Sequence, residues 1–515
     1  MFKKPERRFR IFAIKKMKQL MITLTLAAIL PFSLRSQSKA AEFEKAADEF
    51  YRSVLEQIPG LPGFTIAVVK GDELTYLRGF GQASIDPPVA AGPEVEYYIA
   101  SSTKSFTGLL AALLDAKGIL DLDASLASFF PDARLDPGLE ADKILLRDLL
   151  THTSGLSNDP IGFRSAYSGD HDLKTLLSLV EESEPNESGR GQYEYTNTGY
   201  NIYTLILERE TGKSWKDWLD ELIFTPLGMD HTSGYISEAE RKGWPQAKPY
   251  LSWSAENMEE VYLKKKDNTM QSAGGLITTT GDLARWLRMQ MNDGQLDGKQ
   301  VIPAEIVEMA RQPMAANDES RDEFKPDGYG LGWQSGAYHD HRVVWHFGGF
   351  PGFFTHISYL PEQDLGVAVM VNEAISGNHL MNLLAYYAYD WWLRPESLEG
   401  RKEELTQIRE RSQQISQRIS AHNADRAKRT WQLEHPFAKY NGEYYNPKYG
   451  AITIRGQKEL EVAMGNLHCI AEPYTDKNSI RVELIPGAGM VVQFQLEDGK
   501  VKGFEFDGSR FERVE

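Results

Sequence analysis

Hydrophobic residues recur with the period of strands at both ends of the stretch up to residue 393, and with the period of helices in between. Residues 64–69 and 74–80 lie on either side of the turn residues Gly71 and Asp72, which predicts two paired strands. Similar runs predict three later strands, over 342–346, 353–360 and 365–371. Helical spacing predicts helices over 42–58, near 104–117, near 198–211, near 281–293 and through Tyr386 to Trp392. Strands at both ends with helices between them predict one sheet built from both ends, with an inserted helical lobe.

The pattern changes after this stretch. From Pro395 to about Trp431 the chain is rich in Arg, Glu, Gln and Ser, and its apolar stripe is thin: Leu405, Ile408, Ile415 and Ile419. This predicts a solvated helical linker, with a short coiled coil as the less favoured alternative. Beyond Phe437, short alternating runs between Gly, Asn and Asp turns predict a small all-β barrel or sandwich. We therefore expect a main domain over 41–394, a helical linker over 395–433 and a β domain over 434–515.

The first 38 residues have the layout of an export signal. Lys15, Lys16 and Lys18 precede an uncharged, mostly apolar stretch over 19–34, and polar residues follow over 35–38. The alternative is an uncleaved membrane anchor. It is less favoured, because the apolar stretch is shorter than the roughly 20 residues that a spanning helix needs. We expect an exported protein, periplasmic or extracellular, with no stable membrane span once the signal is removed.

Charge and cysteine content narrow the class of protein. Of the 515 residues 41% are hydrophobic and 25% are charged, which is typical of a globular protein. The net charge is −16, and because residues 1–40 carry +9, the remainder carries −25. Such an acidic body repels nucleic acid, so we expect no nucleic-acid partner. The single cysteine, Cys469, excludes an intramolecular disulfide and a cysteine-based zinc cluster.

One candidate for nucleophilic chemistry is the run Ser101-Ser102-Thr103-Lys104 at the predicted start of a helix. A serine and a lysine three residues later lie on one helix face, one turn apart, so the amine can reach the hydroxyl. Burial and the helix dipole should lower the pKa of the amine and allow it to act as the base that a serine nucleophile needs. The four residues alone equally suit a helix cap and a surface lysine, and Ser36–Lys39 repeats the pattern in the signal region.

Two later segments add functional groups. Tyr195-Thr196-Asn197 can present a phenol and an amide to one cavity, although Tyr444-Tyr445-Asn446 has the same form. In Trp345-His346-Phe347-Gly348-Gly349, a predicted strand ends in glycines that let a substrate approach the backbone. The three elements together are far more specific than any one of them.

In this order and at these separations, the elements resemble the serine β-lactamase-related hydrolases: class C β-lactamases, D-Ala-D-Ala carboxypeptidases, D-aminopeptidases and related esterases. The resemblance covers roughly residues 42–393. Further segments match, namely 149–156, 226–229, Ser272-Ala273-Gly274-Gly275-Leu276 and Tyr329-Gly330-Leu331-Gly332-Trp333. The resemblance implies an α/β (α+β) fold of the β-lactamase/transpeptidase type, with an antiparallel sheet flanked by helices and an all-helical lobe, and neither cofactor nor metal.

The resemblance also implies roles for the residues. Ser101 would form an acyl-enzyme, and Lys104 and Tyr195 would share the proton transfers. Asn197 would orient Lys104 and the substrate, and Gly348 and Gly349 would line the substrate site. The backbone N–H groups of Ser101 and Gly349 would form an oxyanion hole. 

His346 bears on the substrate, because it occupies the position where most β-lactamases carry Lys. A neutral imidazole should bind a substrate carboxylate weakly and in a pH-dependent way. We therefore expect a peptidase or amidase acting on D-amino-acid-containing, cell-wall-type peptides, with a carboxylesterase or a β-lactamase as alternatives. An alternative of another class is a non-hydrolysing penicillin-binding or sensor protein that is acylated and not released.

Other histidines and aromatics have simpler interpretations. His339, His341 and His346 cluster in sequence, but on a strand His341 and His346 point to opposite faces, which argues against a zinc site. His152 and His356 are predicted to be structural, bonded to nearby backbone. The aromatic run over 386–392 is predicted to be a core helix.

The terminal β domain resembles the lipocalin-like barrel appended to some members of the family. One hypothesis is that it covers the mouth of the active site or mediates oligomers. The other is that it only stabilises the chain.

Overall fold

The computed structural model describes residues 39–254, 257–320 and 322–514, so the predicted export signal over 1–38 lies outside the described residues. The described residues divide into two units, one that ends at Ser53 and one that begins at Val54. A helix over 39–57 begins in the first unit and ends in the second, close to the predicted 42–58. None of the described helices is both long enough and apolar enough to cross a membrane.

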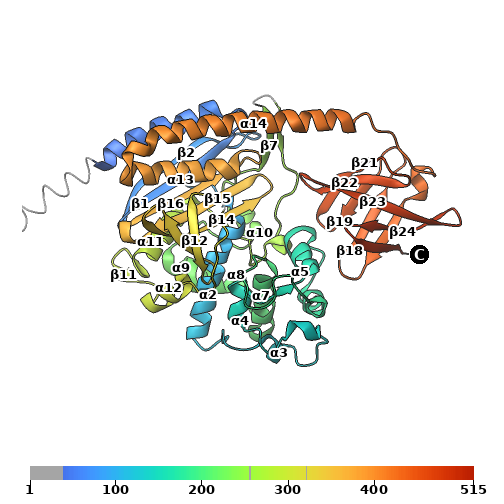
Figure 1. Ribbon diagram of the computed structural model, residues 1–515, viewed down its shortest axis with the longest axis horizontal. Helices are drawn as coiled ribbons and strands as arrows, with labels where there is room; N and C mark the ends of the chain where they lie inside the picture. The colour runs from blue at the N-terminus through green and yellow to red at the C-terminus, as the bar shows by residue number, and fades with distance from the viewer. Residues whose placement is uncertain (1–38, 255–256, 321, 515) are drawn as a thin grey trace, which may run out of the picture. The chain divides into compact units, whose positions relative to one another are not determined.

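An antiparallel sheet of eight strands forms the centre of the second unit, in the order β12-β13-β14-β15-β16-β1-β2-β3 (Figure 1). Its early strands are β1 (Gly63–Lys70), β2 (Glu73–Ser84) and β3 (Val89–Ala90). Its late strands are β12 (Phe324–Tyr329), β13 (Gln334–Tyr338), β14 (His341–Phe350), β15 (Phe353–Leu360) and β16 (Leu365–Val371). Because β1 pairs with β16, the two ends of the stretch meet in one sheet, which confirms the prediction from the pattern.

Helices cover both faces of this sheet. Helices α11 (Thr280–Met291) and α13 (Gly377–Leu393) pack against β16 from opposite sides (Figure 1). On the α11 side the packing is close, since a Cβ added to Gly366 of β16 would lie 3.1 Å from the sulfur of Met291. Helix α13 contains the aromatic run, and Tyr386 and Tyr389 are fully buried in it, so the predicted core helix is confirmed.

The helical lobe follows the first strands. Its longest helices are α2 (Thr103–Ala116) and α7 (Thr198–Thr211), which match the predicted 104–117 and 198–211. Shorter helices complete the lobe and its surroundings: α3 (Leu126–Phe129), α4 (Leu146–Leu150), α5 (Asp159–Phe163), α6 (Leu173–Ser178), α8 (Trp215–Leu219), α9 (Thr225–Leu227), α10 (Ile236–Lys242) and α12 (Ala304–Arg311). Short strand pairs join them: β4 (Tyr97–Tyr98) with β9 (Ile277–Thr278), β5 (Leu156–Ser157) with β6 (Glu184–Pro185), β7 (Tyr250–Ser254) with β8 (Asn257–Glu260), and β10 (Gln295–Leu296) with β11 (Lys299–Gln300).

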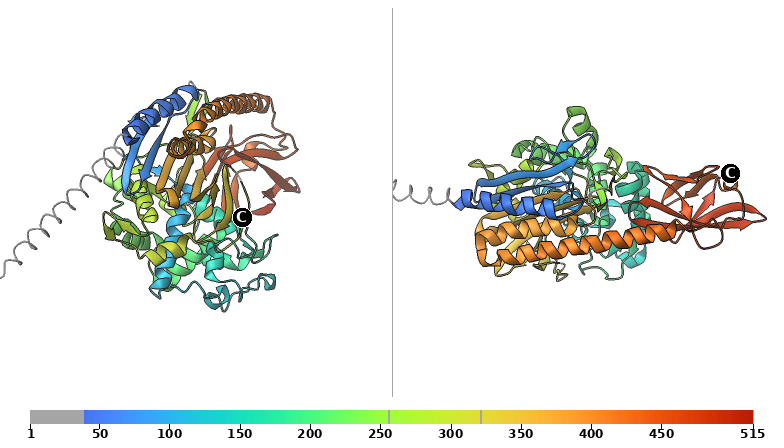
Figure 2. Two further views of the ribbon diagram at one scale, coloured as in Figure 1. Left: turned by 60° about the vertical axis from the view of Figure 1, so that its left-hand side comes forward. Right: turned by 90° about the horizontal axis from the view of Figure 1, so that it is seen from above.

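The long helix α14 (Leu398–Arg426) is helical as predicted, but one face of its first half is buried and not solvated. It lies alongside α13 (Figure 2), and the side chains of Arg401 and Leu405 are buried. Arg401 Nε donates to Asp390 Oδ2 of α13 at 2.8 Å, and Asp390 has no solvent exposure. The prediction missed this attachment because part of it is a polar pair, Arg401 with Asp390, which adds to the burial of Leu405 in the apolar stripe.

The remaining strands form an antiparallel sheet of nine, in the order β20-β19-β18-β17-β25-β24-β23-β22-β21. They are β17 (Gly442–Asn446), β18 (Gly450–Arg455), β19 (Glu461–Met464), β20 (Leu467–Ile470), β21 (Glu472–Pro473), β22 (Ser479–Ile485), β23 (Ala488–Glu497), β24 (Lys500–Phe506) and β25 (Ser509–Arg513). Strand β20 also contacts β22, so the sheet curls into a nearly closed barrel. The predicted small β barrel is confirmed, with Tyr444, Phe494 and Phe504 in its core.

Candidate active site

The structure brings Ser101 and Lys104 together at the junction of the sheet and the helical lobe. Ser101 lies in a short 3₁₀ turn, Ala100–Ser102, that leads directly into α2, and Lys104 lies in the first turn of that helix. Lys104 Nζ lies 3.4 Å from Ser101 Oγ. Ser101 is half-buried and lines a cavity, whereas Lys104 is fully buried. Ala100 has a φ of 46°, a left-handed conformation that is costly for a residue with a side chain and that turns the chain into the helix.

Two other acceptors hold the Lys104 amine. Lys104 Nζ donates to Asn197 Oδ1 at 2.7 Å and to the carbonyl oxygen of Ala273 at 2.8 Å. Its remaining surroundings are largely apolar, with the ring centroids of Tyr195 and Tyr200 at 4.7 and 5.4 Å. Burial lowers the pKa of Lys104 well below its usual 10.5, which favours the neutral amine. A neutral amine has two protons and one lone pair, so donation to Asn197 and Ala273 leaves the lone pair for the Ser101 hydroxyl.

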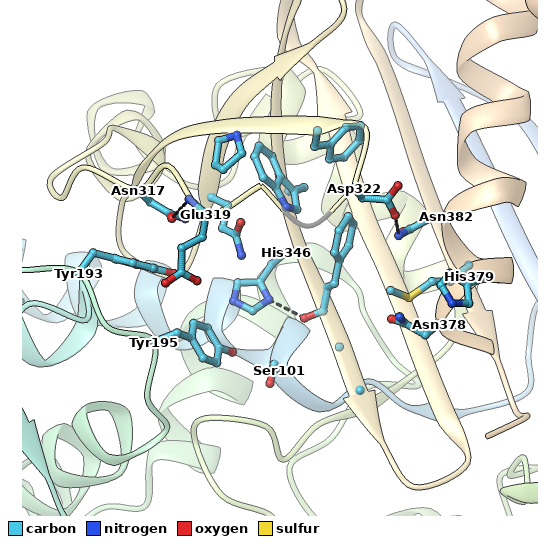
Figure 3. A pocket seen from close by; sticks show the side chains of 18 residues that line it. Ser101, Tyr193, Tyr195, Asn317, Glu319, Asp322, His346, Asn378, His379 and Asn382 are labelled. Atoms are coloured by element: carbon cyan, nitrogen blue, oxygen red, sulfur yellow. Dashed lines mark hydrogen bonds between the residues drawn. The ribbon is translucent and has the colours of Figure 1, made fainter. Parts of the chain in front are cut away.

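Tyr195 and Asn197 come from the loop that enters α7. Asn197 is the residue at the N-cap of that helix, although its side chain is directed to Lys104 and not to the helix backbone. Tyr195 lines the same cavity as Ser101, and its ring centroid lies 6.2 Å from that of His346 (Figure 3). The Tyr195 phenol, the Asn197 amide and the Ser101 hydroxyl thus all lie close to the Lys104 amine.

His346 lies on β14 and is 2% exposed. Its Nδ1 lies 2.7 Å from the carbonyl oxygen of Phe347 (Figure 3), and because a carbonyl only accepts, Nδ1 carries the proton. Its Nε2 therefore accepts from the hydroxyl of Tyr329 at 3.2 Å. Burial, reinforced by Lys104, lowers the pKa of His346 to about 3. The imidazole is therefore neutral at ordinary pH in this structure, and pH-dependent binding of a substrate carboxylate stays a prediction.

Gly348 and Gly349 lie inside β14, which continues to Phe350, so the prediction that the strand ends at these glycines is wrong. The strand continues because β15 pairs with it along this whole length, Gly349 facing Phe354. On its other edge β13 pairs only as far as Trp345. Beyond that point the strand approaches the turn before Ser101, and a Cβ added to Gly348 would lie 2.0 Å from the carbonyl oxygen of Ile99. The glycines thus permit close approach to the nucleophile's own turn.

The cavity in front of Ser101 has a volume of about 460 Å³. Several of its lining residues were not identified from the sequence, because they lie on loops and at the start of α13 and no motif marks them: Asn317, Glu319, Asp322, Asn378, His379 and Asn382 (Figure 3). Two missed contacts did carry a signal. Tyr329 and Ala273 both belong to segments that had been matched to the family, but the sequence did not show that they contact His346 and Lys104.

Three other histidines singled out from the sequence, His152, His356 and His339, do not line the cavity in front of Ser101. His152 is buried, and its Nδ1 accepts from the backbone N–H of Thr196 at 3.2 Å, as predicted. His356 bonds to side chains, Asn382 Oδ1 at 2.8 Å and Ser358 Oγ at 2.5 Å, and so its predicted backbone partner is wrong. His339 Nε2 lies 3.7 Å from Glu323 Oε2. Within residues 39–254, 257–320 and 322–514, no group of three His, Cys, Asp or Glu residues is arranged to hold a metal ion.

Comparison with known proteins relates this site to others. A family model described as Beta-lactamase matches residues 51–386. The chain is 26% identical over 444 residues to unguisins hydrolase ungD' of Aspergillus campestris, an alignment that covers 82% of this chain and 80% of the relative. It also resembles two solved structures, but at identities that speak for the fold alone. One is the octameric penicillin-binding protein homologue from Pyrococcus abyssi (23% identity, TM-score 0.57, 91% of this chain and 99% of that chain). The other is the D-amino acid amidase from Ochrobactrum anthropi SV3 (21% identity, TM-score 0.55, 72% and 98%).

Proposed function

Because the chain belongs to the Beta-lactamase family and has hydrolases among its relatives, we propose that it is a serine hydrolase acting through a covalent acyl-enzyme at Ser101. The observation that carries the proposal is the environment of the Lys104 amine. It lies 3.4 Å from the Ser101 hydroxyl, buried, with its two other contacts made to acceptors. Such an amine is a base placed next to a nucleophile, which is what a serine requires.

The proposed reaction has two halves. In the first, Ser101 Oγ attacks the substrate carbonyl carbon while its proton passes to Lys104 Nζ. The bond from that carbon to the leaving amine or alcohol then breaks, and the leaving group takes the proton, with the Tyr195 phenol as the relay. In the second, water attacks the acyl-enzyme ester, Lys104 takes the water's proton, and the acid product leaves as the proton returns to Ser101 Oγ. Each half passes through an oxyanion, and general-base assistance of this kind contributes roughly 10²–10⁴-fold to a rate.

The oxyanion would be held by backbone N–H groups of Ser101 and Gly349. The close approach of Gly348 to Ile99 supports this assignment, because it brings the Gly349 edge of β14 beside the turn that carries Ser101. Donors fixed in this way stabilise charge that exists only in the transition state.

For the substrate, we favour amides of D-amino acids in small peptides over esters, and esters over β-lactams. His346 supports the order, since a buried neutral imidazole stands where a β-lactamase would present a permanent cation to the β-lactam carboxylate. The D-amino acid amidase with the same fold makes an amide a reasonable first choice.

The test is a comparison of D-alanyl peptides, p-nitrophenyl esters and nitrocefin, with labelling by a fluorophosphonate. Labelling and hydrolysis should vanish in Ser101→Ala. The matched control is Ser105→Ala, a serine one turn later whose hydroxyl bonds only to the backbone oxygen of Ser102 at 2.9 Å, and it should keep both. Labelling that survives Ser101→Ala would overturn the proposal. A penicillin adduct at Ser101 that persists for hours without turnover of any substrate would identify a binding protein of the sensor type.

We further propose that the protein is exported by its first 38 residues. N-terminal sequencing of the mature protein after expression in a bacterium with an outer membrane tests this. A mature chain that begins within about ten residues of position 39 in the periplasm supports export, and an intact N-terminus in the cytoplasm contradicts it.

A further inference from the structure

The terminal β barrel holds one short segment of the helical lobe, residues 164–170, through two of its turns. The first is the turn between β17 and β18. Arg164, which is 4% exposed, donates from Nε to the carbonyl oxygen of Lys448 at 2.7 Å and from Nη2 to that of Pro447 at 3.1 Å. Its third nitrogen, Nη1, donates to the carbonyl oxygen of Asp170 at 2.6 Å, within the segment itself. One buried guanidinium thus ties both ends of the segment to the barrel.

The second contact is the turn between β19 and β20. The backbone N–H of Asn466 donates to the carbonyl oxygen of Ser168 at 2.7 Å, and its side-chain Nδ2 donates to Asn268 Oδ1 at 2.9 Å. Asn268 Nδ2 in turn donates to the carbonyl oxygen of Gly169 at 2.9 Å. Space at this contact is minimal, since a Cβ added to Gly465 would lie 2.2 Å from the carbonyl oxygen of Ser168. The turn therefore fixes the position of the segment's backbone.

The held segment contacts Phe350, which follows directly after Gly349. The ring of Tyr167 stacks on that of Phe350 with centroids 6.0 Å apart. Lys265 donates to the carbonyl oxygen of Ala166, and its Nζ lies 4.1 Å from the Phe350 ring centroid. Phe350 also packs edge-on against Tyr98, 5.1 Å away, in the short strand that leads to Ser101. The segment therefore contacts Phe350, which adjoins Gly349. Through Phe350 it also reaches Tyr98, in the short strand that leads to Ser101.

We propose that the terminal β barrel is a positioning element for the oxyanion hole, acting through residues 164–170 and Phe350. This rests on the proposed function, since it presumes catalysis at Ser101. It differs from a barrel that covers the mouth of the site, because the described residues lining the cavity in front of Ser101 all precede α14. A positioning role has measurable consequences, since a misplacement of about 1 Å can slow a reaction about 100-fold.

The sharpest perturbation is Gly465→Ala, which places a methyl group against the Ser168 carbonyl. The matched control is Gly508→Ala, in the turn between β24 and β25 of the same barrel. Gly508 has a φ of 69° against 57° for Gly465, so both variants carry similar backbone strain, but nothing lies within 4 Å of an added Cβ at Gly508. The two variants thus differ in the contact with the segment. Arg164→Ala is a second, independent perturbation of the same contact.

The assay is fluorophosphonate labelling of the full-length chain under excess probe, with p-nitrophenyl acetate turnover alongside it. We expect the rate constant of labelling and kcat to fall about 10- to 100-fold in Gly465→Ala and in Arg164→Ala, while KM changes less and the final labelled fraction stays complete. Gly508→Ala should keep the rate constant of the natural chain. A variant that merely unfolds shows the reverse, a reduced final fraction with an unchanged rate constant.

An unchanged rate constant in both perturbations, or an equal loss in Gly508→Ala, would overturn the inference. A reduced final fraction in both perturbations with the rate constant kept would do so too, because it shows a purely stabilising barrel. Failure of the proposed function looks different, since Ser101→Ala would then still be labelled.

Discussion

Replacing Asn197 by Asp tests whether the neutrality of Lys104 is what makes it a base. The side chain keeps its shape, but an amide becomes a carboxylate at the atom that lies 2.7 Å from Lys104 Nζ. The carboxylate stabilises the ammonium form, so the pKa of Lys104 must rise, opposite to the effect of burial. At a given pH a larger fraction of the base would then be protonated and unable to accept the proton of Ser101.

The size of the effect follows from the distance. Two unit charges 2.7 Å apart attract by about 6 kcal/mol at an effective dielectric constant of about 20. Desolvation of the new carboxylate costs several kcal/mol and removes part of this gain. A net stabilisation of about 3 kcal/mol moves the protonation equilibrium by about 2 pH units, since each unit corresponds to about 1.4 kcal/mol. On the acid limb of the pH–rate profile, where the amine is protonated in both proteins, the rate of acylation should then fall about 100-fold.

The assay is the rate constant of fluorophosphonate labelling between pH 5 and 10, because this probe offers no amide for Asn197 to bind. The acid limb of the profile should move to higher pH by about 2 units in Asn197→Asp, with the rate recovering on the alkaline side of the shifted limb. Asn378→Asp is the matched control, since Asn378 lines the same cavity but is exposed, and its acid limb should stay in place. An acid limb that does not move, or a loss that is equal at every pH, would refute the reasoning.

Three further predictions concern other parts of the structure. The pKa of His346 is about 3, so the imidazole is already neutral throughout the assay range. His346→Gln should therefore leave the limbs of the pH–rate profile between pH 5 and 9 in place. Loss of a limb would show that the imidazole titrates there. Gly348→Ala should force β14 away from Ile99 and lower the free energy of unfolding, measured by urea denaturation, by about 1–3 kcal/mol. Gly349→Ala should cost less, because its Cβ would meet a ring carbon of Phe354 at 3.3 Å. Equal costs would contradict the packing argument. Arg401→Met should lower the free energy of unfolding by about 3–5 kcal/mol by leaving the Asp390 carboxylate buried without its guanidinium, and adding Asp390→Leu should restore most of it; a single variant as stable as the natural chain would refute the role of the pair.

The architecture was largely predictable, because it is set by local periodicity. The strands at 353–360 and 365–371 and the helix at 198–211 have the predicted bounds, since each is an apolar run between clear turn residues. Helix α14 was harder, because its attachment depends on Arg401 meeting Asp390, a contact between two polar residues that no hydrophobic pattern marks. Glycine in β14 misled the prediction in a similar way, since the partner strand β15 overrides the local weakness of two glycines.

The site was predictable as a set of residue types but not as an electrostatic environment. The resemblance to the family grouped Ser101, Lys104, Tyr195 and His346. In the structure Ser101, Tyr195 and His346 line one cavity, and the buried amine of Lys104 lies 3.4 Å from Ser101 Oγ. The protonation of His346 could not be foreseen, because it depends on the Phe347 carbonyl and on a tyrosine hydroxyl brought by β12. The lining residues from loops were unpredictable for the same reason, since tertiary structure alone brings them to the cavity.

The buried position of the Arg401 side chain, paired with Asp390, limits where recombination can divide this protein. A junction near Pro395, where the composition changes, would separate Arg401 from the buried carboxylate of Asp390. The long helix therefore has to be inherited together with the catalytic fold. Beyond Arg426 that constraint ends, but the core of the barrel also contains Val261 and Leu263, so a module that replaces the barrel has to bury these two side chains. A replacement module would also have to present two turns to residues 164–170. This requirement limits which domains evolution or an engineer can use in place of the barrel.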